Sequence, residues 1–194
     1  MKKLNGKIKH NIAVFISGRG SNLKSIINYS SKRRTLYRVK VVISNKQKAA
    51  GLLIAKKKGI ESYYIDLTKS KKLGNKVLNI LNKNNIKLVC LAGFMKILPR
   101  HFIKLYKGRI INIHPSLLPK YKGLNTHKKV IENKEKYTGC TIHYVNNFLD
   151  SGKIIYQRKV KITKKDCKKS IEKKVLKVEH KIYPKIIDKL LINL

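Results

Sequence analysis

The chain has 194 residues, of which 47 are Lys or Arg and nine are Asp or Glu, so its formal net charge is +38. This length suffices for one substantial core, and we expect a single domain over residues 1–194. Few apolar residues precede Ser17, too few for a signal-peptide core or a membrane span, so we expect a cytoplasmic protein with no membrane partner.

Apolar strands and amphipathic helices alternate along the chain. In chain order the pattern predicts a strand at 12–17, a helix at 22–31, a strand at 39–44, a helix at 49–59, a short strand at 61–67, a helix at 69–84, a strand at 87–93, a short helix at 99–106, a strand at 109–114, a helix at 126–133, strands at 139–145 and 154–162, and a helix at 165–191. We therefore expect an α/β fold with a doubly wound, mostly parallel sheet, an antiparallel C-terminal strand pair and a final helix.

A glycine-rich turn, "SGRGSNL", follows the first predicted strand. Gly18 and Gly20 permit a tight turn, and Ser21 or Asn22 can cap the next helix, whose unpaired N–H groups and dipole favour a phosphate. The spacing lacks the third glycine of a dinucleotide fingerprint and the Lys-Ser/Thr of a P-loop. Taken alone, an ordinary capped turn explains the motif as well as an anion site does.

The segment "INIHPSLLPKYKG" places two polar groups in a strand that is otherwise apolar. Asn112 and His114 share one face of this strand, because successive side chains point to opposite sides. Pro115 ends the strand, so both polar groups lie at its carboxyl end, where open α/β sheets bind ligands. The alternative for an isolated pair of this kind is a loop cap and a satisfied strand-end histidine.

The cysteines Cys90, Cys140 and Cys167 are widely separated and lack CxxC spacing. Neither a disulfide framework nor a zinc site is indicated, so we expect reduced, mostly buried thiols and no metal.

Seven segments together resemble the glycinamide ribonucleotide formyltransferases, folate-dependent enzymes of purine synthesis. They are "ISGRGSNL", "SNK", "LAGFMKILP", "INIHPSLLPKYKG", "GCTIHYV", "LDSG" and "EHKIYP", and they extend from about residue 11 to residue 184. The resemblance implies a Rossmann-like formyltransferase fold, with a phosphate-binding half at about 1–100 and a catalytic and folate-binding half at about 88–194.

The resemblance also implies the reaction. A formyl group would pass from the co-substrate 10-formyltetrahydrofolate to the amine of glycinamide ribonucleotide, giving formylglycinamide ribonucleotide in de novo purine biosynthesis. The alternative is another folate-linked formyltransferase, or a formyltetrahydrofolate hydrolase, on the same core. Methionyl-tRNA formyltransferase carries an extra C-terminal domain and the hydrolase usually an N-terminal one, so a chain of 194 residues favours the smallest member.

Three catalytic residues follow from the resemblance: Asn112, His114 and Asp150. Asn112 and protonated His114 would donate to the oxyanion of a tetrahedral intermediate. Asp150 would raise the pKa of His114 and relay protons through water, whereas without the resemblance the sequence "LDSG" indicates a β-turn residue. His143 would support the pocket.

The substrate contacts are implied in the same way. The phosphate would bind Gly20, Ser21 and Asn22, and Arg19 is an extra cation that the family pattern does not supply. Glu179 would receive the glycyl amine or a ribose hydroxyl, with a structural salt bridge as the alternative. Family members often have an arginine at the position of Lys96. A lysine ammonium cannot make the bidentate contact of an arginine, so such a contact to the folate carboxylate is in doubt. The folate would lie against Met95, Lys96, Ile97, Leu98 and Asn112.

The charge itself suggests a second hypothesis, a nucleic-acid-binding module. However, 40 of the basic residues are Lys and seven are Arg, although Arg gives the bidentate recognition of phosphates and bases. The lysines are spread along the chain with abundant Asn, Ile and Tyr, residues of A/T-rich codons. We interpret the excess as base composition filling solvated positions, and we expect no specific nucleic-acid partner.

Overall fold

The structure is a computed structural model that describes residues 9–192. Residues 1–8, which belong to the basic N-terminal stretch in which the sequence shows no signal-peptide core, lie outside it, as do residues 193–194 of the predicted domain.

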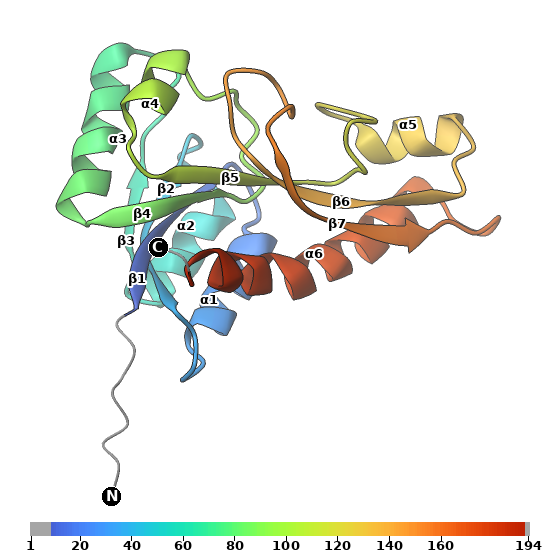
Figure 1. Cartoon of the computed structure of the whole chain (residues 1–194), viewed down its shortest axis with the longest axis horizontal. Coiled ribbons are helices and arrows are strands. Elements are labelled where there is room, and N and C mark those ends of the chain that lie inside the picture. The colour runs from blue at the N-terminus through green and yellow to red at the C-terminus, as the bar shows by residue number, and fades with distance from the viewer. Residues whose placement is uncertain (1–8, 193–194) are drawn as a thin grey trace, which may run out of the picture.

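The described residues form seven strands and six helices (Figure 1). The strands are β1 (His10–Ile16), β2 (Tyr37–Ser44), β3 (Glu61–Tyr64), β4 (Ile86–Leu91), β5 (Arg109–His114), β6 (Tyr137–Tyr144) and β7 (Ile154–Lys161). The helices are α1 (Ser21–Ser30), α2 (Ala50–Lys57), α3 (Lys71–Lys83), α4 (Arg100–Leu105), α5 (Thr126–Glu132) and α6 (Lys168–Leu190).

All strands belong to one sheet of order β3-β2-β1-β4-β5-β6-β7. The first five strands in this order pair in parallel, whereas β6 runs antiparallel to β5 and β7 antiparallel to β6. The predicted fold class is therefore confirmed. The main differences in bounds are that β3 ends at Tyr64, before the buried residues Ile65 and Leu67, and that α6 begins at Lys168.

Helices cover both faces of the sheet, as the near-continuous apolar sequences of β1, β2 and β4 require. On one face α1, α2 and α6 pack against a cluster that includes Ile12, Val14 and Cys90. On the other face α3 and α4 pack against a cluster that includes Phe15 and Val89. Neighbouring residues of a strand belong alternately to the two clusters. Both faces of the strands are therefore buried, which explains why their sequences have almost no polar positions.

The sheet has a switch point between β1 and β4. From β1 the chain continues outward to β2 and β3, and from β4 it continues in the opposite direction to β5. The segments after β1 and β4 therefore diverge at the carboxyl edge of the sheet and leave a crevice, which is where such folds bind ligands.

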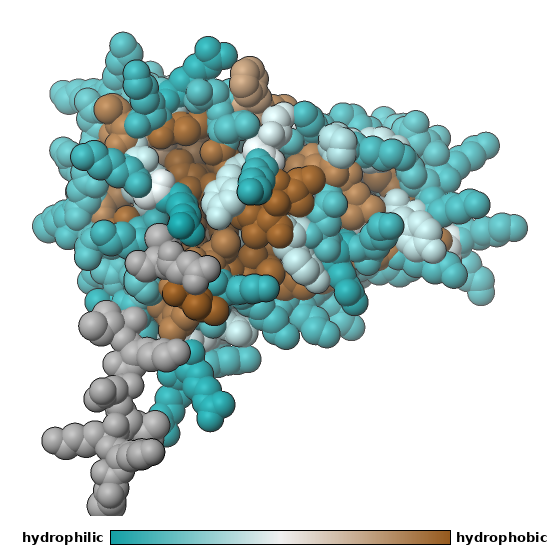
Figure 2. Space-filling view, in the orientation of Figure 1, coloured by the Kyte–Doolittle hydropathy of each residue, from teal (hydrophilic) through white to brown (hydrophobic). Residues whose placement is uncertain are grey.

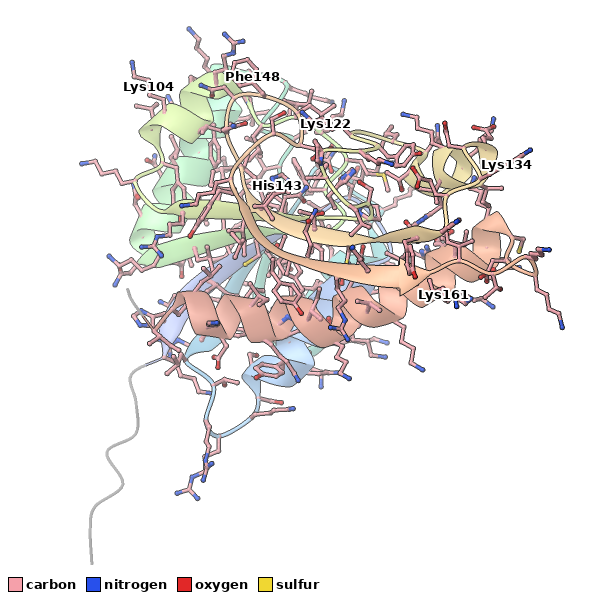
Figure 3. All side chains as sticks on the ribbon, turned by 45° about the vertical axis from the view of Figure 1, so that its right-hand side comes forward. Lys104, Lys122, Lys134, His143, Phe148 and Lys161 are labelled. Atoms are coloured by element: carbon pink, nitrogen blue, oxygen red, sulfur yellow. The ribbon has the colours of Figure 1, made fainter. Side chains whose placement is uncertain are left out.

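Hydrophilic side chains surround the face of the molecule shown in Figure 2, around an apolar area at its middle. Figure 3 shows Lys104, Lys122, Lys134 and Lys161 on separate parts of the fold. Within residues 9–192, no helix has the length and apolar character needed to cross a membrane.

Candidate active site

A cleft of about 660 Å³ lies at the carboxyl edge of the sheet, over the switch point. Its walls come from the segments after β1, β4 and β5, from the loop after β6, and from α6. Every site residue expected from the sequence lies on these walls: Arg19, Gly20, Ser21, Asn22, Met95, Lys96, Ile97, Leu98, Asn112, His114, His143, Asp150 and Glu179. A more open hollow of about 750 Å³ over α3 holds none of them.

The glycine loop, residues 18–20, leads into α1 at one end of the cleft. Gly20 is the N-cap of α1 and has a left-handed backbone with φ 73°, which favours glycine. Among the described residues no side chain caps this helix, so the expectation that Ser21 or Asn22 does so is wrong. The first amides of α1 consequently keep free N–H groups beside the cleft, an arrangement suited to an anion.

The side chain of Asn22 is instead occupied by α6. Its Nδ2 donates to Oε2 of Glu179 at 2.7 Å, across 157 residues of sequence. Glu179 is only 5% exposed, and this burial raises its pKa to about 7 despite the bond from Asn22. Oδ1 of Asn22 is buried and has no partner within the described part of the chain. The Glu179 carboxyl group and Oδ1 of Asn22 are therefore two hydrogen-bond acceptors beside the anion site, and they suit a ligand that donates hydrogen bonds.

Asp150 is the centre of a polar cluster at the base of the cleft. Its Oδ2 accepts from the Gly123 amide at 2.9 Å and lies 3.3 Å from Nδ1 of His114. Its Oδ1 lies 3.4 Å from Nδ2 of Asn112 and 3.6 Å from Nε2 of His143. The strand alternation predicted for Asn112 and His114 is thus confirmed, and both side chains face the same carboxylate. Figure 3 shows His143 on β6, below the loop that carries Phe148.

The ring contacts define which nitrogens are available. Nε2 of His114 lies 2.9 Å from the Tyr121 carbonyl, and Nδ1 of His143 lies 2.8 Å from the Tyr144 carbonyl, so we assign the N–H to these atoms. The remaining nitrogens, Nδ1 of His114 and Nε2 of His143, both face Asp150. Nδ1 of His114 hydrogen-bonds to the carboxylate only when a proton lies between them, so the pair is arranged to hold and pass one proton.

Burial and the Asp150 carboxylate act on the pKa of His114 in opposite directions. Burial lowers the pKa of His114, and this outweighs the Tyr121 carbonyl and the Asp150 carboxylate, which raise it. The Asp150 carboxylate thus raises the pKa of His114 as predicted, but burial outweighs this effect. Burial raises the pKa of Asp150, but the contacts with His143, the Gly123 amide and His114 together hold it below its usual value.

The loop after β4, residues 92–98, forms the apolar wall. Met95 and Ile97 are 61% and 62% exposed, whereas Leu98 is buried in the core behind the cleft. The Met95 amide donates to Oγ of Ser17 at 2.7 Å, so this N–H is not free for a ligand. Exposed Phe148 and Leu149 also line the cleft, and exposed apolar groups at a concave site are suited to a flat, partly apolar ligand.

Some cleft residues were not expected from the sequence. His127, at the start of α5, lines the cleft, and its buried Nδ1 has no partner among residues 9–192. Glu172 of α6 lies 2.9 Å from Nη2 of Arg19, so this extra cation is held at the surface by an ion pair. No local sequence pattern predicts that His127 or Glu172 lies in the cleft, because each reaches it only through the packing of its helix.

The comparisons with known proteins agree with this geometry. The family model described as "Formyl transferase" matches residues 10–187. The phosphoribosylglycinamide formyltransferase of Escherichia coli strain K12 is 39% identical over 180 residues, which cover 91% of this chain and 85% of the relative. The trifunctional purine biosynthetic protein adenosine-3 of Gallus gallus is 40% identical over 190 residues, covering 93% of this chain and 19% of the relative, so the chain spans about a fifth of that protein.

The fold comparison gives the same result. The crystal structure of phosphoribosylglycinamide formyltransferase from Anaplasma phagocytophilum has a TM-score of 0.89 and 39% identity, covering 94% of this chain and 87% of that one. The enzyme from Bacillus halodurans has a TM-score of 0.88 and 35% identity, covering 93% of this chain and 95% of that one. The chain therefore belongs to the formyl transferase family, among the phosphoribosylglycinamide formyltransferases.

Proposed function

We propose that this chain transfers the formyl group of 10-formyltetrahydrofolate to the amine of glycinamide ribonucleotide. The observation that carries the proposal is the Asp150 carboxylate, which meets His114 and Asn112 within 3.4 Å at the base of a cleft whose end is the uncapped helix α1. One cleft thus offers an anion site, a proton-transfer pair and an apolar wall. These features match a ribonucleotide phosphate, an acyl-transfer centre and a pterin.

In the proposed reaction the phosphate binds the first amides of α1, with Gly20, Ser21 and Asn22 as the contact residues. Glu179 accepts a hydrogen bond from the glycyl amine or a ribose hydroxyl. The folate lies along Met95, Lys96, Ile97 and Leu98. This placement brings the amine and the formyl carbon together over Asn112 and His114, so that orientation removes much of the entropic barrier.

The chemical step needs a positive donor and a proton acceptor. The amine attacks the formyl carbon and forms a tetrahedral intermediate, whose oxyanion receives a hydrogen bond from Asn112 and is stabilised by the positive charge of protonated His114. Asp150 stabilises the imidazolium and takes part in moving the proton from the amine to N10 of the folate. The bond from carbon to N10 then breaks, leaving formylglycinamide ribonucleotide and tetrahydrofolate. His143 holds Asn112 and Asp150 in position.

The test uses three acceptors with the same formyl donor: glycinamide ribonucleotide, charged tRNA and water. We expect the purified protein to form product with the free ribonucleotide, and His114→Ala to lose that activity. Formate release without an acceptor would instead identify a hydrolase, and formylation of tRNA a different transferase. Either result overturns the proposed acceptor.

The glycine loop supplies a first prediction. A Cβ at Gly20 would lie 2.6 Å from Cα of Gly51, and φ 73° is strained for any other residue, so Gly20→Ala must shift the loop and its amides. We expect the KM for the ribonucleotide to rise about tenfold, with little change in the KM for the folate. Gly59→Ala is the matched control, because Gly59 has φ 64° but no described atom within 4 Å of its Cβ position. Equal changes in both KM values would contradict a phosphate role.

The lysines supply a second prediction. Lys69, Lys71 and Lys72 are exposed at the start of α3 and lie outside the cleft. Replacing all three with Gln should leave turnover within about twofold and weaken non-specific binding to heparin or DNA at low salt. A large loss of formyl transfer, or binding at physiological salt that depends on nucleic-acid sequence, would favour a dedicated polyanion site.

A further inference from the structure

We propose that Ser17 and Asn45 are positioning residues, which hold the loop after β4 in register with the glycine loop. The inference rests on the proposed function and adds residues that lie behind the cleft wall. Ser17 is 2% and Asn45 6% exposed. Oγ of Ser17 donates to Oδ1 of Asn45 at 2.5 Å and accepts from the Met95 amide at 2.7 Å. The "SNK" segment thereby acquires a function beyond its place in the strand.

The structure gives each bond a direction. The Met95 amide can only donate, so Oγ of Ser17 is its acceptor, and the single hydroxyl proton is left for Asn45. This orients the Asn45 side chain with its oxygen toward Ser17. Bonds in series at a buried site polarise and orient one another, so loss of Asn45 should also weaken the bond from Met95.

The bridge lies where the two substrate loops separate. The pairing of β1 with β4 is continued by the Ala92 amide, which donates to the Phe15 carbonyl at 2.9 Å. Beyond this point the chain after β1 enters the glycine loop, while the chain after β4 forms residues 92–98. The bond from Met95 to Ser17 is the next link across the divergence. It therefore sets the distance between the phosphate end and the folate wall of the cleft.

The segment after β2 holds the glycine loop as well. The Gly51 amide donates to the Gly18 carbonyl at 3.1 Å, and Gly51 leaves room for Gly20 to approach the helix closely. A Cβ on Gly51 would meet Cδ1 of Ile16 and lie 3.3 Å from Cα of Gly20. Asn45, after β2, and Gly51, in the first turn of α2, thus join both substrate loops to neighbouring residues of the chain.

The geometry predicts a kinetic signature rather than a general loss of stability. Misplacement of reacting groups by about 1 Å can cost about a hundredfold in rate, so a displaced folate wall should lower kcat and raise the KM for the folate. In Ser17→Ala we expect kcat to fall about tenfold and the KM for the folate to rise about tenfold. The KM for the ribonucleotide should change less than about threefold. Asn45→Ala should show a smaller change of the same kind, and Asn45→Asp should recover most of the activity because it keeps an acceptor for Ser17.

The control is Thr35→Val, which also removes a buried, hydrogen-bonded hydroxyl, but in the loop before β2 and far from the carboxyl edge. It should lower the melting temperature without changing the ratio of the two KM values. If Ser17→Ala behaves like Thr35→Val, or leaves both the KM for the folate and kcat unchanged, the positioning role is wrong.

A second measurement separates this inference from the proposed function. Hydrogen exchange followed by NMR reports the Met95 amide directly, whatever the protein catalyses. We expect strong protection in the unmodified chain and Asn45→Asp, and much faster exchange of Met95 in Ser17→Ala. Inactivity of the unmodified chain with protected Met95 would refute the proposed reaction only, whereas unchanged Met95 exchange in Ser17→Ala would refute the bridge.

Discussion

Asp150→Asn should fold, bind both substrates and lose most of its turnover. The amide has nearly the volume of the carboxylate and suits the left-handed conformation of this residue, φ 45°, so the loop is expected to persist. What disappears is the charge that faces Nδ1 of His114 at 3.3 Å. We expect kcat to fall about 10²- to 10⁴-fold, the usual range for a lost acid–base group, with substrate dissociation constants within about threefold.

The pH profile gives the sign of this effect. Burial already lowers the pKa of His114, and the Asp150 carboxylate opposes that shift. Without the carboxylate the imidazolium is less stable, so His114 loses its proton at a lower pH. The descending basic limb of kcat should move to lower pH in Asp150→Asn. A limb that stays in place would show that His114 is not the titrating acid.

A double variant tests whether the pair acts as a unit. If Asp150 works through His114, Asp150→Asn combined with His114→Ala should be little worse than the worse single variant. Strictly additive losses would refute the coupling. Glu132→Gln is a suitable control, because it makes the same chemical change at an exposed carboxylate on α5, outside the cleft. It should leave kcat and its pH profile unchanged.

The parts of the site that are local in sequence are predictable from physical rules. Asn112 and His114 share a face because a strand alternates, and both lie at the edge of the sheet because Pro115 follows. The mostly parallel sheet follows equally well from the alternation of strands and helices. By contrast, no local rule joins Asp150 to His114, and that expectation came from the resemblance to a family.

The helix cap shows why local rules failed elsewhere. Propensity favours Ser21 or Asn22 as the cap of α1, but the buried carboxylate of Glu179 recruits Asn22 from 157 residues away. A buried acid needs a donor, and this requirement outweighs a local preference of about 1 kcal/mol. The Ser17–Asn45 bridge is hidden for the same reason, since its three members come from three segments that meet only in the folded sheet.

The final prediction concerns stability, because Glu179 is an acid that folding places in an unfavourable environment. Its pKa rises from 4.5 to about 7 in the folded chain. Between these values the unfolded chain has released the proton that the folded chain still holds, so the free energy of unfolding falls as pH rises, by about 1.4 kcal/mol per pH unit. The loss is complete above the folded pKa and amounts to about 3 kcal/mol at most.

Glu179→Gln should remove this dependence, because the amide stays neutral and still accepts the bond from Asn22. We expect the variant and the unmodified chain to be similarly stable near pH 4.5, and the variant to be more stable by up to about 3 kcal/mol at pH 8. Urea unfolding across this pH range measures the difference in free energy of unfolding between the two proteins. The titrations of the histidines cancel in this difference, because both proteins contain them. Glu172→Gln makes the same chemical change at a partly exposed carboxylate of the same helix and should show no such divergence. If Glu179 also binds the ribonucleotide, the more stable variant should have a higher KM for it, and stabilisation with an unchanged KM would leave Glu179 without a substrate role.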